Sequence, residues 1–75
     1  MKEKTHNNLR LLRLLHGDLS QQYVAYKLEV SQPAYSKMER GELIASEKTL
    51  KNVCLLYRLE RPELIFLPIE EIIQR

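Results

Sequence analysis

The sequence predicts a small all-α domain on three grounds. Only two glycines and three prolines interrupt a chain of 75 residues. Apolar residues recur at helical spacing in several segments, and serine or glycine stands where those segments begin or end. The hydrophobic fraction of 44% and the charged fraction of 29% are those of a folded domain in water. We therefore expect a single domain over residues 1–75, built as a compact bundle of about five short helices.

The first helix is expected from Thr5 to His16. Gly17 supplies the left-handed residue that commonly ends a helix, and Asp18 follows as a turn residue. The leucines of this segment spread over roughly 220° of the helix at about 100° per residue, which is wider than one core-facing stripe. Either neighbouring helices cover both flanks of this helix, or one flank contacts another subunit.

Two short helices should follow, separated by about three residues. Ser20 is a good N-cap for a helix over residues 21–28. Ser31 is the N-cap of the next helix, which should stop at Gly41. Pro33 lies in the first turn of that helix, where a missing N–H costs least. The two helices are therefore expected to form a close pair.

The remaining helices are less regular. Ser46 should begin a fourth helix that runs through about Leu59, and Arg61 and Pro62 begin a fifth segment. Residues 69–73 have helical spacing, although a short strand would also fit.

The C-terminal third carries more apolar residues than a monomer of this size can readily bury. Eight of the last twelve residues are apolar, and two leucines of the fourth helix lie away from its core-facing residues. An exposed apolar patch of this kind usually marks a partner surface. We expect a homodimer, with residues 61–75 as a candidate dimerisation segment. The candidate contact residues are Leu55, Leu59, Phe66, Ile69 and Ile72.

The residues offer no site for catalysis, a metal or a cofactor. His6, His16 and Cys54 lack the spacing of metal ligands, and glycine occurs only at positions 17 and 41, too few for a phosphate-binding loop. The lone cysteine cannot form an internal disulfide, and the apolar runs are far shorter than the ~20 residues of a membrane span. No apolar signal segment follows the charged start. We expect a non-enzymatic protein of a reducing cell interior.

The charge is mildly positive and unevenly distributed. Residues 1–40 carry seven basic and four acidic groups, a net of +3, whereas residues 41–75 carry five and six, a net of −1. This asymmetry is weak support for a polyanionic partner. It places the positive excess in the half that contains the two paired helices.

Two short helices joined by a tight turn are a helix-turn-helix signature, whose second helix enters the major groove of DNA. Several stretches at fixed offsets resemble the Cro/CI-type (XRE family) helix-turn-helix domain. They are Leu19-Ser20-Gln21-Gln22-Tyr23-Val24-Ala25, Lys27-Leu28-Glu29-Val30-Ser31-Gln32 and Tyr35-Ser36-Lys37-Met38-Glu39-Arg40-Gly41, with Ser46, Thr49 and Leu50 in the fourth helix. The resemblance covers roughly residues 8–68. It implies a lambda-repressor-like fold with the helix-turn-helix at residues 20–40 and the recognition helix at 32–40.

The sequence departs from the family pattern at two places. Glu29 stands between the paired helices where the family often has glycine, and a left-handed backbone there would cost about 1 kcal/mol or more. One extra residue lies within residues 14–18. By resemblance, Arg13 and Glu39 form an ion pair that fixes the orientation of the helices; the alternative for Glu39 is a solvated carboxylate.

The polar residues of the recognition helix suggest separate roles. The amide of Gln32 matches the adenine edge, and Lys37, farther along the same face, could donate to guanine or to a phosphate. Pro33 cannot donate, so it contacts a thymine methyl group or nothing. Ser36 can donate or accept, and Arg40 is best placed for a phosphate. Gln21 begins the preceding helix, where backbone N–H groups suit a phosphate, and the family uses a glutamine there.

Three functions fit this sequence. The first is a small homodimeric transcriptional regulator, a repressor or a restriction-modification controller, on inverted half-sites of double-stranded DNA about 34 Å apart. The second is a DNA-binding antitoxin, which also binds a toxin protein. The third is a protein-interaction adaptor that has lost its DNA contacts. The resemblance further implies a cytoplasmic protein of a prokaryotic cell or a phage.

Overall fold

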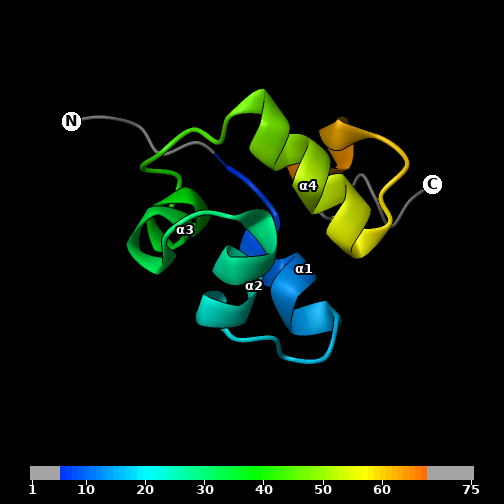
Figure 1. The fold of residues 1–75 in the computed structure, drawn as a ribbon. Coiled ribbons are helices and arrows are strands. Elements are labelled where there is room, and N and C mark those ends of the chain that lie inside the picture. Colours follow the sequence, from blue (N-terminus) through cyan, green and yellow to red (C-terminus); the bar gives the residue numbers. More distant parts are fainter. Residues whose placement is uncertain (1–5, 68–75) are drawn as a thin grey trace.

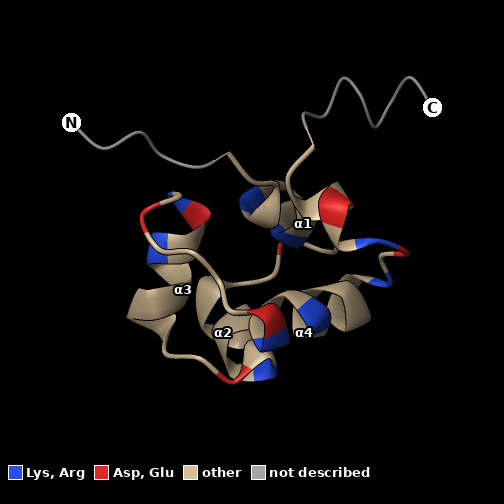
Figure 2. Cartoon of the chain, turned by 90° about the horizontal axis from the view of Figure 1, so that it is seen from above, with Lys and Arg blue, Asp and Glu red and all other residues tan. Residues whose placement is uncertain are grey.

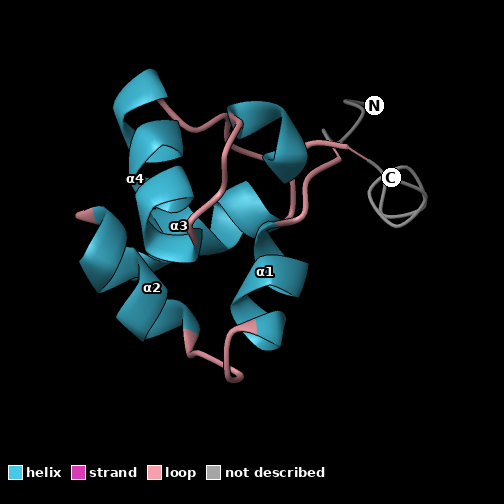
Figure 3. Cartoon of the chain, turned by 90° about the vertical axis from the view of Figure 1, so that its right-hand side faces the viewer, coloured by secondary structure: helices cyan, strands magenta, loops and turns pink. Residues whose placement is uncertain are grey.

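The structure, a computed structural model, describes residues 6–67 of the chain (Figure 1). The described residues form helices and loops without a strand (Figure 3), so the prediction of an all-α bundle is confirmed. The elements are α1 (Leu9–Leu15), α2 (Gln21–Leu28), α3 (Gln32–Glu39), α4 (Glu47–Tyr57) and the 3-10 helix η1 (Pro62–Ile65). Residues 69–73, expected as a helix or a strand, lie outside the described residues. No helix within residues 6–67 is long and apolar enough to cross a membrane.

One hydrophobic core joins all five elements. Its buried residues are Leu9, Val24, Ala25, Leu28, Tyr35, Met38, Val53, Tyr57 and Ile65, and partly buried side chains such as Leu12, Leu50 and Leu59 pack around them. The α2 and α3 helices pack against each other, α4 packs on α2, and η1 closes the core beside α4. In Figure 1, α3 lies at one side of the molecule and η1 at the opposite side, so the outer face of α3 stays uncovered by these elements.

The α1 helix begins later than Thr5, the predicted start, and the prediction is corrected here to Leu9. The side chain of Asn7 accepts a hydrogen bond from the Leu9 N–H at 3.0 Å, as a helix-start residue does. The side chain of Asn8 donates to the carbonyls of Leu64 and Leu67 at 2.9 and 2.7 Å. Asn8 therefore ties the chain before α1 to the region of η1, and Asn7 donates to the Met38 carbonyl of α3 at 2.8 Å, which together hold residues 6–8 out of the helix.

The α4 helix ends at Tyr57, earlier than the predicted Leu59, because Arg58 adopts a left-handed conformation with φ 55°. The Leu59 N–H then donates to the Cys54 carbonyl at 2.9 Å, a bond typical of a left-handed helix end. This turn carries Leu59 back onto the core, where it is partly buried. The prediction that Leu59 lies away from the core is therefore wrong, whereas Leu55 is 77% exposed.

Candidate nucleic-acid interface

The paired helices begin and end as the capping residues predict. The Ser20 hydroxyl accepts from the Tyr23 N–H at 3.0 Å, and the Ser31 hydroxyl accepts from the Ala34 N–H at 3.2 Å. Each serine therefore satisfies one of the backbone donors that a helix start leaves unpaired. Both helices keep their first turn without help from a ligand.

The turn between the helices is left-handed at Glu29, with φ 61° and ψ 39°. The N–H groups of Glu29 and Val30 donate to the Tyr26 and Ala25 carbonyls at 3.1 and 3.0 Å, which closes the end of α2. A side chain in this conformation costs about 1 kcal/mol, yet the turn keeps its hydrogen bonds. The family's usual glycine is thus replaced without loss of the turn.

The extra residue between α1 and α2 is accommodated in a loop with two consecutive positive φ angles, 99° at Gly17 and 53° at Asp18. The Asp18 and Leu19 N–H groups donate to the Leu14 and Arg13 carbonyls at 3.1 and 3.2 Å. With this loop, Arg13 of α1 still reaches Glu39 of α3.

Arg13 of α1 and Glu39 of α3 form a bidentate ion pair, with Nε–Oε2 at 2.6 Å and Nη2–Oε1 at 3.2 Å. The exposed fractions of the two side chains are 12% and 4%. Arg13 also donates from Nη1 to the Leu19 carbonyl at 2.7 Å, and Gln21 donates from Nε2 to Glu39 Oε1 at 3.0 Å. The network joins α1, the loop before α2, α2 and α3, so it fixes how the paired helices sit on the core.

Burial alone would raise the pKa of the Glu39 carboxyl, but the hydrogen bonds from Arg13 and Gln21 and the charge of Arg13 outweigh it and hold the pKa below its ordinary value. The pKa of Arg13 is raised, chiefly by the hydrogen bond to Glu39. The Tyr35 hydroxyl is buried without a hydrogen-bond partner. Because the pKa of Glu39 is lowered and that of Arg13 is raised, both members of the pair are ionised at neutral pH.

The residues predicted to face DNA lie on the outer side of α3, with differences in their surroundings. Gln32, Pro33, Lys37 and Arg40 are exposed, and Ser36 is half-buried between them. The inward residues of the same helix, Tyr35 and Met38, are buried. The α3 helix thus divides into a core face and an uncovered polar face.

Gln21 is not simply a solvated glutamine at the start of α2. Its side chain is half-buried, and its amide nitrogen is engaged with Glu39. The first backbone N–H groups of an α-helix have no partner within the helix, so a phosphate at this end could still be held by the backbone.

Arg40, expected to contact a phosphate, is held by two neighbours. Its Nη1 donates to the Ser36 hydroxyl at 2.7 Å, and its Nε and Nη2 donate to the Glu42 carboxylate at 3.1 and 3.3 Å. Figure 2 shows acidic and basic segments alternating where α3 leads into the next loop. Sequence reasoning missed Glu42, although the string Arg40-Gly41-Glu42 places an acid after a helix-ending glycine and beside an arginine.

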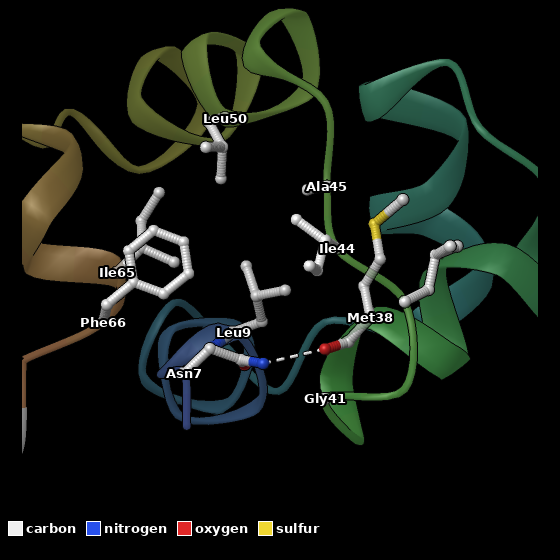
Figure 4. Close-up of a pocket in the computed structure, with 10 residues that line it drawn as sticks. Asn7, Leu9, Met38, Gly41, Ile44, Ala45, Leu50, Ile65 and Phe66 are labelled. Carbon is white, nitrogen blue, oxygen red and sulfur yellow. Dashed lines mark hydrogen bonds between the residues drawn. The ribbon is translucent and has the colours of Figure 1, made fainter. Parts of the chain in front are cut away.

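The candidate dimerisation residues fall on two separate surfaces. Leu55 and Leu59 line a hollow of about 270 Å³ together with Lys51, Glu60 and others. Phe66, which is 40% exposed, instead lines a small hollow of about 30 Å³ between residues 7–9, the loop after α3 and η1 (Figure 4). Ile69 and Ile72 lie outside the described residues. The prediction therefore combined two apolar patches that the fold separates.

Two short helices joined by a tight turn, the second tied to α1 by a buried ion pair and polar on its outer face, define a helix-turn-helix protein. The Helix-turn-helix family model, of the Cro/CI (XRE) type, matches residues 9–64, and the chain therefore belongs to this family. The family is one of DNA-binding transcription regulators and is not typically enzymatic. No match was found among curated proteins or among solved structures. Among the described residues, no group of three or more histidine, cysteine or acidic side chains could hold a metal ion.

Proposed function

We propose that this protein is a small homodimeric transcriptional regulator, of the repressor or restriction-modification controller type, that binds an inverted repeat in double-stranded DNA. The observation that carries the proposal is the uncovered polar face of α3, set on a core that is locked by the Arg13–Glu39 pair. A rigid helix that presents amide, hydroxyl and ammonium groups is suited to reading base edges in the major groove.

Gln32 and Lys37 carry base recognition in this proposal. Gln32 lies in the first turn of α3, and both side chains are exposed. The Gln32 amide can donate to adenine N7 and accept from adenine N6 at once, and each such bidentate contact is worth about 1–3 kcal/mol of discrimination. Pro33 offers only an apolar contact with a thymine methyl group. The Lys37 ammonium can donate to guanine O6 and N7 or to a phosphate.

Gln21 supplies position rather than sequence information. The start of α2 directs backbone N–H groups outward, where the positive end of the helix dipole favours a phosphate. The bond from Gln21 to Glu39 holds this helix end in a fixed relation to α3. The phosphate contact and base contacts are thereby kept in register.

The dimer is proposed to form through the C-terminal half of α4. Leu55 is 77% exposed and stands between two hollows, one bordered by Lys51 and Glu60 and the other by Lys27 and Arg58. An isologous interface brings the same patch of two copies together, so a protruding leucine next to a hollow is self-complementary. Lys51 of one copy can then meet Glu60 of the other. This surface lies away from α3 (Figure 1), so a second copy leaves the recognition helix uncovered.

The dimer surface is tested with Leu55→Glu, and Ile44→Glu is the matched control. Ile44 is 83% exposed, so it adds the same charge at an equally solvated apolar position on the other patch. Sedimentation velocity at a series of concentrations should show a dimer for wild type and Ile44→Glu and a monomer for Leu55→Glu. If Leu55→Glu remains a dimer and Ile44→Glu is a monomer, the proposed surface is wrong and the interface lies at the patch that contains Ile44 and Phe66.

DNA binding is tested by selection from a randomised duplex pool. An inverted repeat should be enriched. On the selected sequence, Gln32→Ala should relax one base position in each half-site, whereas Gln21→Ala should weaken all sequences equally. If nothing is enriched and the affinity stays at the non-specific level of about 10⁻⁴–10⁻⁶ M, the helices serve as a protein-interaction scaffold and the proposal is wrong.

A further inference from the structure

Glu42 forms an ion pair with Arg40, the residue that caps the C-terminal end of the recognition helix α3. Its carboxylate accepts two hydrogen bonds from Arg40, at 3.1 and 3.3 Å, and the same guanidinium donates to the Ser36 hydroxyl at 2.7 Å. The exposed fractions of the Arg40 and Glu42 side chains are 48% and 40%. One arginine thus joins two polar groups that border the outer face of α3.

The backbone sets Glu42 in this position. Gly41 adopts a left-handed conformation with φ 74°, and its N–H donates to the Met38 carbonyl at 3.1 Å. The Glu42 N–H donates to the Lys37 carbonyl at 2.9 Å, so the chain folds back over the end of α3. Glycine is the residue best suited to this turn, because a Cβ would be strained at such a φ angle.

The helix itself does not favour an acid here. The C-terminal end of a helix carries a partial negative charge, which disfavours a carboxylate. A carboxylate on the DNA-facing side would also repel the phosphates. Arg40 is a cation that offsets both effects, and the charges of Arg40 and Glu42 sum to zero.

We propose that Glu42 is a positioning residue that competes with DNA phosphate for Arg40 and so weakens the phosphate contact at the end of the recognition helix. The inference rests on the proposed DNA-binding function. In the absence of DNA, Arg40 is held over Ser36 by Glu42. On binding, the guanidinium transfers from the Glu42 carboxylate to a phosphate, and the Ser36 hydroxyl becomes able to contact a base edge.

The competition has a thermodynamic signature in salt. A phosphate that receives a cationic side chain releases its condensed counterions, which steepens the fall of log K with log salt by about 0.9 per contact. In the wild type, Arg40 leaves the Glu42 carboxylate in the same step, and because salt also screens that ion pair, its loss offsets part of this release. Removing the charge of Glu42 should therefore raise the affinity and steepen the salt dependence.

The experiment measures the binding of a fluorescent duplex of random sequence by anisotropy, from about 50 to about 200 mM salt. Glu42→Gln is compared with wild type and with Glu63→Gln. Glu63 is an exposed acid in η1, at the far side of the molecule from α3 (Figure 1). Glu63→Gln therefore changes the net charge as much as Glu42→Gln does, but away from the recognition helix. Glu42→Gln should bind about two- to fivefold more tightly at low salt, the range expected for loss of one exposed ion pair. Its salt slope should be steeper by up to about 0.9.

Arg40→Gln separates competition from simple repulsion. If Glu42 acts through Arg40, the gain from Glu42→Gln should largely vanish in the Arg40→Gln background. A gain that persists there, or one that Glu63→Gln reproduces, overturns the inference, as does wild-type affinity in Glu42→Gln. The failure of the proposed function is read separately from the selection experiment, because then no sequence is enriched from the randomised pool, whatever Glu42→Gln does to the non-specific affinity.

Discussion

Glu39→Gln removes the charge on which three hydrogen bonds in the interior converge. Arg13 contributes two of these donors and Gln21 the third, at 2.6, 3.2 and 3.0 Å. A glutamine keeps the size of the side chain but replaces one acceptor oxygen by an NH₂ group, which must then face a donor of Arg13 or of Gln21. The substitution therefore tests how much the charge, rather than the packing, holds the helices together.

The magnitude follows from the burial of the pair. Breaking a buried pair by removing one partner costs about 3–5 kcal/mol, because the remaining charge is left without compensation. Arg13 keeps 12% of its side chain exposed and retains its bond to the Leu19 carbonyl, which favours the lower end. We expect a loss of about 3 kcal/mol. A chain of 75 residues has a free energy of unfolding of roughly 4–11 kcal/mol, so the variant should be close to its threshold.

Urea unfolding followed by circular dichroism at 222 nm measures the loss. With an m-value of about 1 kcal/mol/M, the midpoint of Glu39→Gln should fall by about 3 M at unchanged m. Glu63→Gln, a neutralised exposed acid outside both proposed binding surfaces, is the control and should shift the midpoint by less than about 0.5 M. A loss below about 1 kcal/mol for Glu39→Gln would refute the reasoning, because the pair would then act as an ordinary surface ion pair.

The loss of unfolding free energy in Glu39→Gln should depend on pH. The pKa of Glu39 is lowered in the folded state, because the hydrogen bonds from Arg13 and Gln21 and the charge of Arg13 outweigh the effect of burial. The stability that it contributes is therefore present above the ordinary glutamate value of about 4.3 and is lost as the pH falls through the folded-state pKa. The difference in unfolding free energy between wild type and Glu39→Gln should shrink in acid. A constant difference down to the lowest pH at which both remain folded would contradict it.

Three further predictions concern single positions. Glu29→Gly should raise the unfolding free energy by about 0.5–1 kcal/mol in urea titrations, because φ is 61° there. Arg61→Gly, at an exposed position with an extended backbone, should not. Tyr57→Phe should leave the stability unchanged or raise it by up to about 1 kcal/mol, because the hydroxyl is buried without a hydrogen-bond partner. Burial, assisted by the charge of Glu39, raises the pKa of Tyr57 to about 12. Ionisation of Tyr57 therefore has no effect on stability below the ordinary tyrosine value of about 10 and lowers the stability of the wild type as the pH rises from 10 through 12. The phenolate absorbance step near pH 12 should be missing in Tyr57→Phe; if the step remains, the assignment is wrong.

Local rules predicted most of the paired helices. Ser20, Ser31 and Ser46 each accept a hydrogen bond from the residue three positions ahead, as their place before an apolar segment indicates. Such caps depend on neighbouring residues alone, so one sequence is enough to find them. The start of α1 was missed because Asn8 bonds to Leu64 and Leu67, which no local pattern relates to it.

The side-chain network was only partly predictable. The resemblance placed Arg13 beside Glu39, but it gave no indication that Gln21 turns inward to the same carboxylate. The ion pair between Arg40 and Glu42 depends on the left-handed turn at Gly41, which the glycine itself predicts. It also depends on the side-chain rotamers of both residues, which the sequence does not predict. Apolar content indicated a partner surface, yet the separation of Leu55 from Phe66 comes from the packing of η1 on α4.

The central claim is that the outer faces of α2 and α3 bind double-stranded DNA. Titration of a duplex selected from the random pool into ¹⁵N-labelled protein, followed by amide chemical shifts, tests it most directly. The account predicts the largest changes at the start of α2, along residues 32–37 and at Arg40, with small changes in η1. Changes confined to the surface around Leu55, or none at concentrations above the non-specific range of about 10⁻⁴ M, would contradict it.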